Sequence, residues 1–177
     1  LEVLKAVKSG AKLIVVSPSE LSLNRFSSLW LKIKPETESG VFALLSKFLL
    51  EAGDGKKFTG IPGFDAFKES LSELDASKIL KMAGVAEMEI KEGCSLLEKD
   101  PAVFLFGTGL TQQPGQKQNL FSLWNLALQT KARLIPLGSE NNQRGEFELS
   151  KHFLARAKTF EHVVEAVLSK KIKVLYL

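Results

Sequence analysis

The sequence has little of two residue types on which many sites depend. It contains one cysteine, Cys94, and two histidines, His152 and His162. A single cysteine excludes an internal disulfide or a cysteine-cluster metal site within this chain. We expect Cys94, in a predicted helix at 90–97, to be a small core residue, a pattern that favours a reducing cytoplasm. The histidines stand alone in polar surroundings, which predicts ordinary surface residues.

Long apolar runs and clustered charge are also missing. No apolar run approaches the roughly 20 residues of a membrane span, and we expect neither direct membrane insertion nor a signal peptide. The net charge of +4 is modest. The lysines are scattered without interleaved aromatic residues, so we expect no nucleic-acid binding.

Recognisable catalytic patterns are absent from the sequence as well. It has no Ser-His-Asp order, no His-Glu-x-x-His and no Walker loop. Glu140 and Glu146 have a spacing that an acid and base pair could use, but a solvated loop explains them equally well. We therefore expect no catalytic residue and no metal ligand in this chain, and no activity from it alone.

The most informative stretch is 101–130. Its apolar run at 102–106, bounded by proline and glycine, predicts a strand buried on both faces. The glycines of 107–112 predict a tight turn with positive φ that brings backbone N–H groups toward a ligand's phosphates, although a plain turn would look the same. A helix is predicted next by apolar residues at helical spacing: Leu120, Leu123, Trp124 and Ala127.

Similar units fill the rest of the chain. Apolar runs predict further strands at 12–16, 30–33, 132–137 and 173–177. Between them, helices are predicted at 1–9, 37–52, 64–74, 75–84, 86–99 and 160–168, with Thr37 and Asp75 or Ser77 as N-caps. This alternation predicts an α/β fold: a three-layer, largely parallel, Rossmann-like sheet with helices on both faces.

The expected organisation is one α/β domain at 1–150, with 151–177 completing it or beginning an adjoining domain. The chain opens at Leu1, inside a predicted helix, and its last predicted strand has nothing after it. We expect a fragment of a larger subunit.

Four polar loops follow predicted strands, at 17–20, 34–38, 107–112 and 138–145. If the sheet is parallel, these loops converge on one edge and form a groove suited to a dinucleotide-like ligand. Surface turns are the alternative.

Five segments occur in an order that carries a resemblance. A helix leads into Gly-Ala-Lys at 10–12 and an apolar strand ending in Ser-Pro at 17–18. Leu-Trp-Leu-Lys-Ile-Lys-Pro-Glu-Thr follows at 29–37, and Gly-Thr-Gly-Leu-Thr-Gln at 107–112 precedes a helix with Asn-Leu-Ala. Asn-Asn-Gln-Arg-Gly stands at 141–145, and Lys-Ile-Lys-Val-Leu-Tyr at 171–176. The series resembles the molybdopterin oxidoreductase family, which includes formate dehydrogenase catalytic subunits and the large iron–sulfur subunit of NADH:quinone oxidoreductase (complex I).

The resemblance implies an α/β domain that helps to hold a molybdopterin guanine dinucleotide. The iron–sulfur clusters and the metal ligand would lie elsewhere in the full subunit. By position, the resemblance places seven residues toward the cofactor: Ser17, Ser19, Lys34, Gly107, Gly109, Gln112 and Glu140.

Three of these loops depart from the family pattern. Ser-Pro-Ser-Glu at 17–20 replaces Asp-Pro-x-Arg, which removes a charged acceptor and a bidentate phosphate ligand. Glu36 stands where glycine is usual, and Gly-Ser-Glu at 138–140 replaces Arg-Gly-Gln. Complex I large subunits similarly keep the fold and generally lack the cofactor.

These departures favour a complex I-type fragment with a degenerate site and a structural role in an electron-transfer complex. Its partners would be the other domains and subunits, in the cytoplasm or peripheral to the inner membrane through those subunits. One alternative is the cofactor-binding domain of a formate dehydrogenase-type molybdenum or tungsten enzyme. The other is a free-standing α/β nucleotide-binding module.

Overall fold

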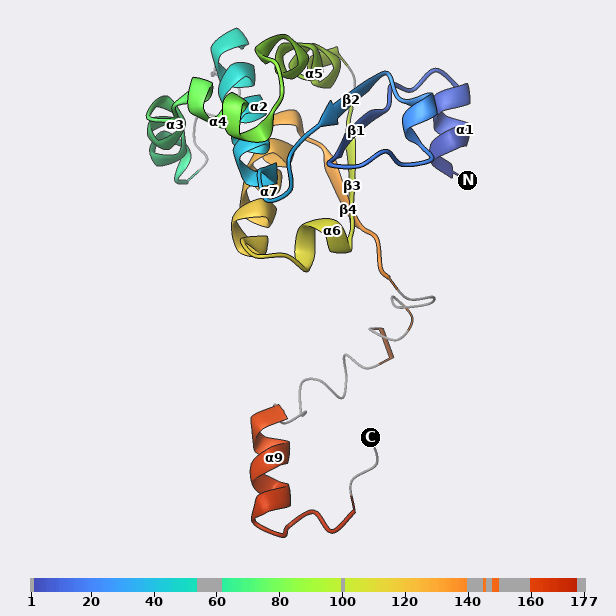
Figure 1. Ribbon diagram of the computed structural model, residues 1–177, viewed down its shortest axis with the longest axis vertical. Coiled ribbons are helices and arrows are strands. Elements are labelled where there is room, and N and C mark those ends of the chain that lie inside the picture. The colour runs from blue at the N-terminus through green and yellow to red at the C-terminus, as the bar shows by residue number, and fades with distance from the viewer. Residues whose placement is uncertain are drawn as a thin grey trace. The chain divides into compact units, whose positions relative to one another are not determined.

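The computed structural model describes residues 2–53, 62–99, 101–139, 145, 148–149 and 160–174 (Figure 1). It divides into two compact units, Leu1–Leu137 and Gly138–Leu177. Helix α9 (Phe160–Leu168) belongs to the second unit, and the other elements below belong to the first.

The first unit contains two pairs of short parallel strands. Strand β1 (Ile14–Ser17) pairs with β2 (Leu29–Lys32), with Ile14 opposite Leu29. Strand β3 (Val103–Phe106) pairs with β4 (Arg133–Pro136), with Leu105 opposite Ile135. In the described residues, hydrogen bonds do not join the two pairs into one sheet. The mixed α/β class with parallel strands is confirmed, whereas a three-layer Rossmann-like sheet is not.

Helices connect these strands. They are α1 (Glu2–Lys8), the 3-10 helix η1 (Asn24–Phe26), α2 (Glu38–Ala52), α3 (Phe64–Ser72), α4 (Ala76–Ala83), α5 (Glu87–Lys99), α6 (Thr108–Thr111) and α7 (Gln116–Thr130). Local signals set some of the boundaries. Asp75 caps α4 as predicted, because its Oδ1 accepts from the Lys78 N–H at 3.0 Å, and Gly84 ends the helix at φ 74°. None of the helices in the described ranges is long and apolar enough to span a membrane.

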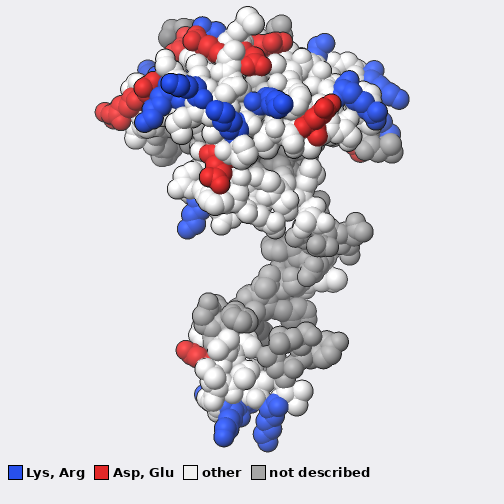
Figure 2. Space-filling model, viewed as in Figure 1, with Lys and Arg blue, Asp and Glu red and all other residues white. Residues whose placement is uncertain are grey.

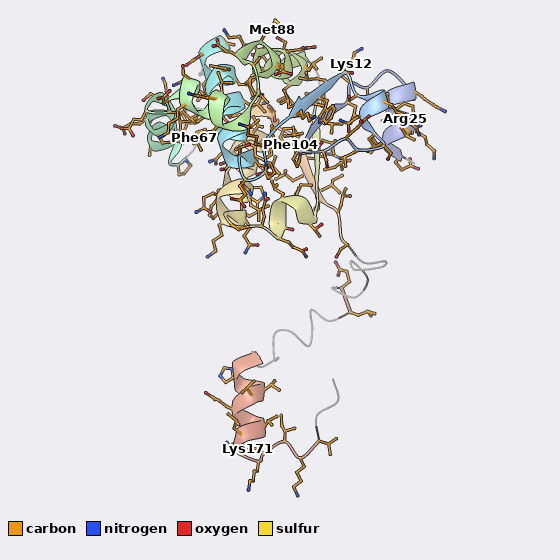
Figure 3. The ribbon with its side chains drawn as sticks, in the orientation of Figure 1. Lys12, Arg25, Phe67, Met88, Phe104 and Lys171 are labelled. Carbon is orange, nitrogen blue, oxygen red and sulfur yellow. The ribbon has the colours of Figure 1, made fainter. Side chains whose placement is uncertain are left out.

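The core forms around α2, which packs against α4, α5 and α7. Among its most deeply buried side chains are Leu31, Leu44, Ile90 and Leu126. Both strand pairs line this core, β2 through buried leucines and β3 and β4 through Phe104, Phe106 and Leu134. Figure 3 shows Phe104 among the strands and helices of the first unit.

Cys94 is the buried core residue that the sequence predicts. Its Sγ–H donates to the Leu45 carbonyl oxygen at 3.6 Å, which joins α5 to α2. Burial raises the pKa of the Cys94 thiol to about 12, because the core disfavours the thiolate. The thiol is therefore an inert part of the packing.

Two predictions about burial are wrong. Strand β3 is covered on one face only, since Val103 is 53% exposed and Leu105 42% exposed. Helix α7 is rotated from the predicted stripe, because Trp124 is exposed and Asn119 is buried beside Leu123 and Leu126.

Two predicted secondary-structure assignments differ from the structure. The turn predicted at 107–112 contains one helical turn, α6. The strand predicted at 173–177 is not formed at Lys173 and Val174, and its remaining residues lie outside the described part.

Candidate functional site

The described segments that follow the strands lie close together in the first unit, and the predicted loop at 138–145 belongs to the second unit and lies mostly outside the described residues. The Ser39 N–H, at the start of α2, donates to Asn119 Oδ1 in α7 at 3.1 Å, which brings the segments after β2 and β3 together. A Cβ placed on Gly107 would lie 3.6 Å from the Leu137 carbonyl oxygen, so the segment after β4 adjoins as well. Ser17 lies opposite Lys32 in the β1–β2 register. We call residues 17–20, 34–39, 107–119 and 137 the strand-end edge.

In the first of these loops, the hydroxyl of Ser17 is already engaged. Ser17 is buried, its Oγ–H donates to the Ser19 carbonyl oxygen at 2.7 Å, and its Oγ accepts from Trp30 Nε1–H at 3.1 Å. The Ser19 side chain is exposed. Internal hydrogen bonds therefore satisfy the buried polar group that this loop would offer to a ligand.

The second loop is anchored through its backbone. The Lys34 N–H donates to the Ala83 carbonyl oxygen at 2.9 Å, and its carbonyl oxygen accepts from Thr37 Oγ1–H at 2.6 Å. Thr37 is the N-cap residue by position, but its hydroxyl makes no capping bond to α2, so its predicted capping role is wrong. Lys34 itself is exposed, and a Cβ on Gly84 would lie 3.3 Å from its Cε. Its stem therefore lies over the end of α4.

Glu36, in the same loop, has a left-handed backbone with φ 65°. This conformation costs a residue with a side chain roughly 1–2 kcal/mol and is easy for glycine. Glu36 is the position at which the resemblance expects glycine. The backbone of Glu36 therefore has a conformation that favours glycine, whereas its side chain is a carboxylate.

Besides Ser17, two buried polar residues belong to this edge, Glu38 and Asn119, and Asn119 was not expected from the sequence. Asn119 is 3% exposed, and its Oδ1 caps α2 while its Nδ2 has no hydrogen-bond partner. Glu38 is 8% exposed in the first turn of α2, and its Oε2 also has no partner. A carboxylate there is favoured by the helix dipole. Asn119 lies at helical spacing from Leu123 and Leu126, on the apolar stripe of α7. This spacing was the sequence signal that Asn119 is buried.

The glycine loop does not use glycine as expected. Gly107 has an extended φ of −135° and Gly109 lies within α6, so neither has the predicted positive φ. A Cβ on Gly109 would meet nothing within 4 Å. Gln112 is exposed, and its N–H closes α6 by donating to the Thr108 carbonyl oxygen at 2.9 Å. Glu140 lies outside the described residues.

The residues around the start of α2 do not fit the diphosphate of a pterin dinucleotide. A diphosphate requires free N–H donors and cationic side chains. Here Asn119 already accepts from the Ser39 N–H, and the carboxylates of Glu36 and Glu38 belong to the same loop and helix start. Negative charge and a filled capping position both oppose a bound anion. Among the described residues, no cluster of His, Cys, Asp or Glu is arranged to hold a metal ion.

Comparison with known proteins gives similarity to large oxidoreductase subunits, and no family model matches the chain. It is 25% identical over 130 residues to the assimilatory nitrate reductase catalytic subunit of Bacillus subtilis, covering 71% of this chain and 18% of that protein. It is 24% identical over 204 residues to NADPH-Fe(3+) oxidoreductase subunit alpha of Geobacter sulfurreducens, covering 97% and 24%. With formate dehydrogenase H of Escherichia coli it shares 22% identity over 157 residues, covering 83% and 22%.

The fold has a counterpart among solved structures. Acetylene hydratase from Pelobacter acetylenicus matches 71% of this chain with a TM-score of 0.65 and 21% sequence identity, over 18% of its own length. The chain spans between 18% and 24% of the length of the three curated relatives named above. The similarity supports the molybdopterin oxidoreductase superfamily, and it does not show the complex I type.

Proposed function

We propose that the chain is one α/β segment of a large subunit of the molybdopterin oxidoreductase type, and that its strand-end edge serves structure rather than cofactor binding. The observation that carries this proposal is the bond from the Ser39 N–H to Asn119 Oδ1, with Glu38 buried at the same helix start. The chain itself supplies the acceptor and the negative charge that an anionic ligand would bring. Its role is then that of a complex I-type large subunit, where the fold supports an electron-transfer complex.

The finer architecture belongs to the same proposal. The two strand pairs would form part of a three-layer, Rossmann-like sheet in the complete subunit, with 1–150 as the dinucleotide-binding-like domain and 151–177 completing it or opening the next. The partners would be the remaining domains and other subunits of an electron-transfer complex. The expected location is the cytoplasm or the inner-membrane periphery, reached through those subunits. The seven predicted cofactor-facing residues stay predictions.

Calorimetric titration with GDP tests this proposal. We expect no saturable heat from the chain at millimolar GDP, because the first turn of α2 is capped and negatively charged. A Glu36→Gly, Glu38→Gln double variant should bind GDP no more tightly than the unchanged chain, because Asn119 Oδ1 still accepts the hydrogen bond from the Ser39 N–H. Saturable binding of GDP that exceeds binding of ADP and weakens in Lys34→Ala would overturn the proposal. Lys12→Ala, before the start of β1, is the matched control.

The same titration decides for a second candidate, the cofactor-binding domain of a formate dehydrogenase-type enzyme. Similarity to formate dehydrogenase H and to a nitrate reductase catalytic subunit favours it. In that case the exposed Lys34 would contact the diphosphate as a point charge. The chemistry of substrate oxidation would come from the cofactor and from residues outside this chain.

A further inference from the structure

The outer face of the β3–β4 pair is apolar and uncovered in the first unit. Its side chains alternate with those that face the core: Val103 is 53% exposed, Leu105 42%, Ile135 44%, and Leu137, just after β4, 52%. The register places Leu105 opposite Ile135 and Val103 opposite Arg133. We call Val103, Leu105, Arg133, Ile135 and Leu137 the outer face.

Parallel strands are a reason to expect a cover. Parallel sheets occur almost only with both faces buried, because their crossover connections place helices on the sheet. The inner face of β3 and β4 meets this expectation through Phe104, Phe106 and Leu134. The outer face does not, although all of its residues except Arg133 are apolar. An uncovered apolar face of this kind marks an interaction site.

The local charge indicates the chemistry of the cover. Between Pro101 and Ser139 the charged residues are Lys117, Lys131 and Arg133, and no Asp or Glu occurs. Figure 2 shows acidic and basic groups gathered over α3, α4 and α5, whereas the same view of α6 is largely uncharged. Arg133 is exposed on the outer face beside Val103. A complementary partner presents apolar side chains with carboxylates at its margin.

We propose that the outer face docks an amphipathic helix with an apolar stripe flanked by carboxylates, supplied by the remainder of a larger subunit. A helix is the element that covers parallel strands, and a flanking carboxylate would pair with Arg133. The source of the helix rests on the proposed function and on relatives at least four times longer than the matched segment. The face and its charge do not depend on that function.

Two synthetic peptides of about 18 residues, five helical turns, test the proposal. Both carry the same Leu and Val stripe, one flanked by Glu and the other by Lys. Each is titrated into the full chain with labelled Leu, Val and Ile methyl groups, followed by NMR. We expect the Glu-flanked peptide to shift the signals of Val103, Leu105 and Ile135 saturably, and to bind about tenfold more tightly than the Lys-flanked one.

Variants show whether the face itself is responsible. Leu105→Asp should abolish binding, and Val103→Asp, at a more exposed position, should do the same if Leu105→Asp fails to fold. Met88→Asp is the matched control, because Met88 is 76% exposed on α5 (Figure 3) and should bind as the unchanged chain does. Arg133→Gln should remove the preference for Glu flanks.

Three results would overturn the docking proposal. The first is equal binding of both peptides, or binding of neither. The second is unchanged binding by both Asp variants. The third is a free chain whose outer-face methyl groups are already shielded from a soluble paramagnetic agent, whether by the chain itself or by a second copy seen in sedimentation. GDP titration is read at the strand-end edge, so a failure of the proposed function is distinguishable from a failure here.

Discussion

The β1–β2 pair and the β3–β4 pair each consist of two parallel strands of four residues, but their surroundings differ. In β2, Leu31 is fully buried and Leu29 nearly so, whereas in β3 Val103 and Leu105 are about half exposed. Yet β3, with the sequence Val-Phe-Leu-Phe, is the more apolar strand, since β2 is Leu-Trp-Leu-Lys. The apolar composition of a strand therefore indicates how much burial its side chains could have. The elements packed beside the strand determine how much burial they do have.

The largest expected difference is in thiol reactivity, between the core that includes β2 and Cys94 and the outer face of β3. Cys94 packs under α2, and the rise of its pKa from 9.0 to about 12 means roughly a thousandfold less thiolate near neutral pH. An aromatic disulfide reagent should therefore label Cys94 at least about a thousandfold more slowly than Leu105→Cys in a Cys94→Ala background. Comparable rates would show that the α2–α5 packing opens readily.

The same pKa gives a pH dependence with a definite sign. Well below pH 9 the thiol is protonated in both the folded and the unfolded chain, so it contributes no pH dependence there. Between pH 9 and 12 the unfolded thiol ionises while the folded one does not, so stability should fall as pH rises. Denaturant unfolding of Cys94→Ala, compared across this range, isolates the contribution from other groups. An identical decline in both chains would contradict the prediction.

Side-chain truncation should separate the strand pairs next. Leu31→Ala in β2 should lower the free energy of unfolding by about 3 kcal/mol, because a fully buried leucine leaves a cavity. Leu105→Ala in β3 should cost only about 1 kcal/mol, because that side chain is already partly in water. Equal losses in urea unfolding would mean that the outer face is covered in solution.

The hydrogen bond between Asn119 and Ser39 joins α7, which follows β3, to α2, which follows β2. Its removal should lower the free energy of unfolding by an intermediate amount. Asn119→Ala removes the cap of α2 and should destabilise the chain by about 1–2 kcal/mol. Hydrogen exchange at the Ser39 amide should accelerate, while Gln118→Ala, an exposed neighbour, changes neither quantity. Unchanged exchange at Ser39 would remove the structural basis of the proposed function.

Each region also contains a left-handed residue at which glycine should help slightly. Glu36 (φ 65°) follows β2, and Lys131 (φ 53°) precedes β4. Glu36→Gly and Lys131→Gly should each stabilise by about 0.5–1 kcal/mol, because strain relief exceeds the entropy that glycine adds to the unfolded chain. Thermal melts of the two variants measure this, and a loss at either position would show that its side chain makes a needed contact.

Much of the local structure could be predicted from the sequence. Four strands form within or next to their predicted ranges, because short apolar runs bounded by Gly, Pro or polar residues are local signals. The cap at Asp75 and the stop at Gly84 are equally local. Burial was harder: the rotation of α7 and the exposed face of β3 depend on what packs against them, which no window of sequence contains.

The candidate site was less predictable for a related reason. Its decisive contact joins Ser39 and Asn119, which are 80 residues apart. Thr37 has the right residue type for a cap, yet its hydroxyl bonds to Lys34 instead. The Thr37 hydroxyl is the near candidate acceptor for an N–H at the start of α2, and Asn119 Oδ1 is the distant one. Which of the two caps the helix is decided only when α2 and α7 have packed together.

The cap on α2 by Asn119 also bears on how such a subunit is made. In a domain whose helix end waits for a bound anion, that corner stays loose until maturation supplies the ligand. Here the contact that closes the corner joins α2 to α7 within the chain itself, so this contact needs no bound anion. Under the proposed function, synthesis of this segment and insertion of a prosthetic group elsewhere in the subunit would be independent steps.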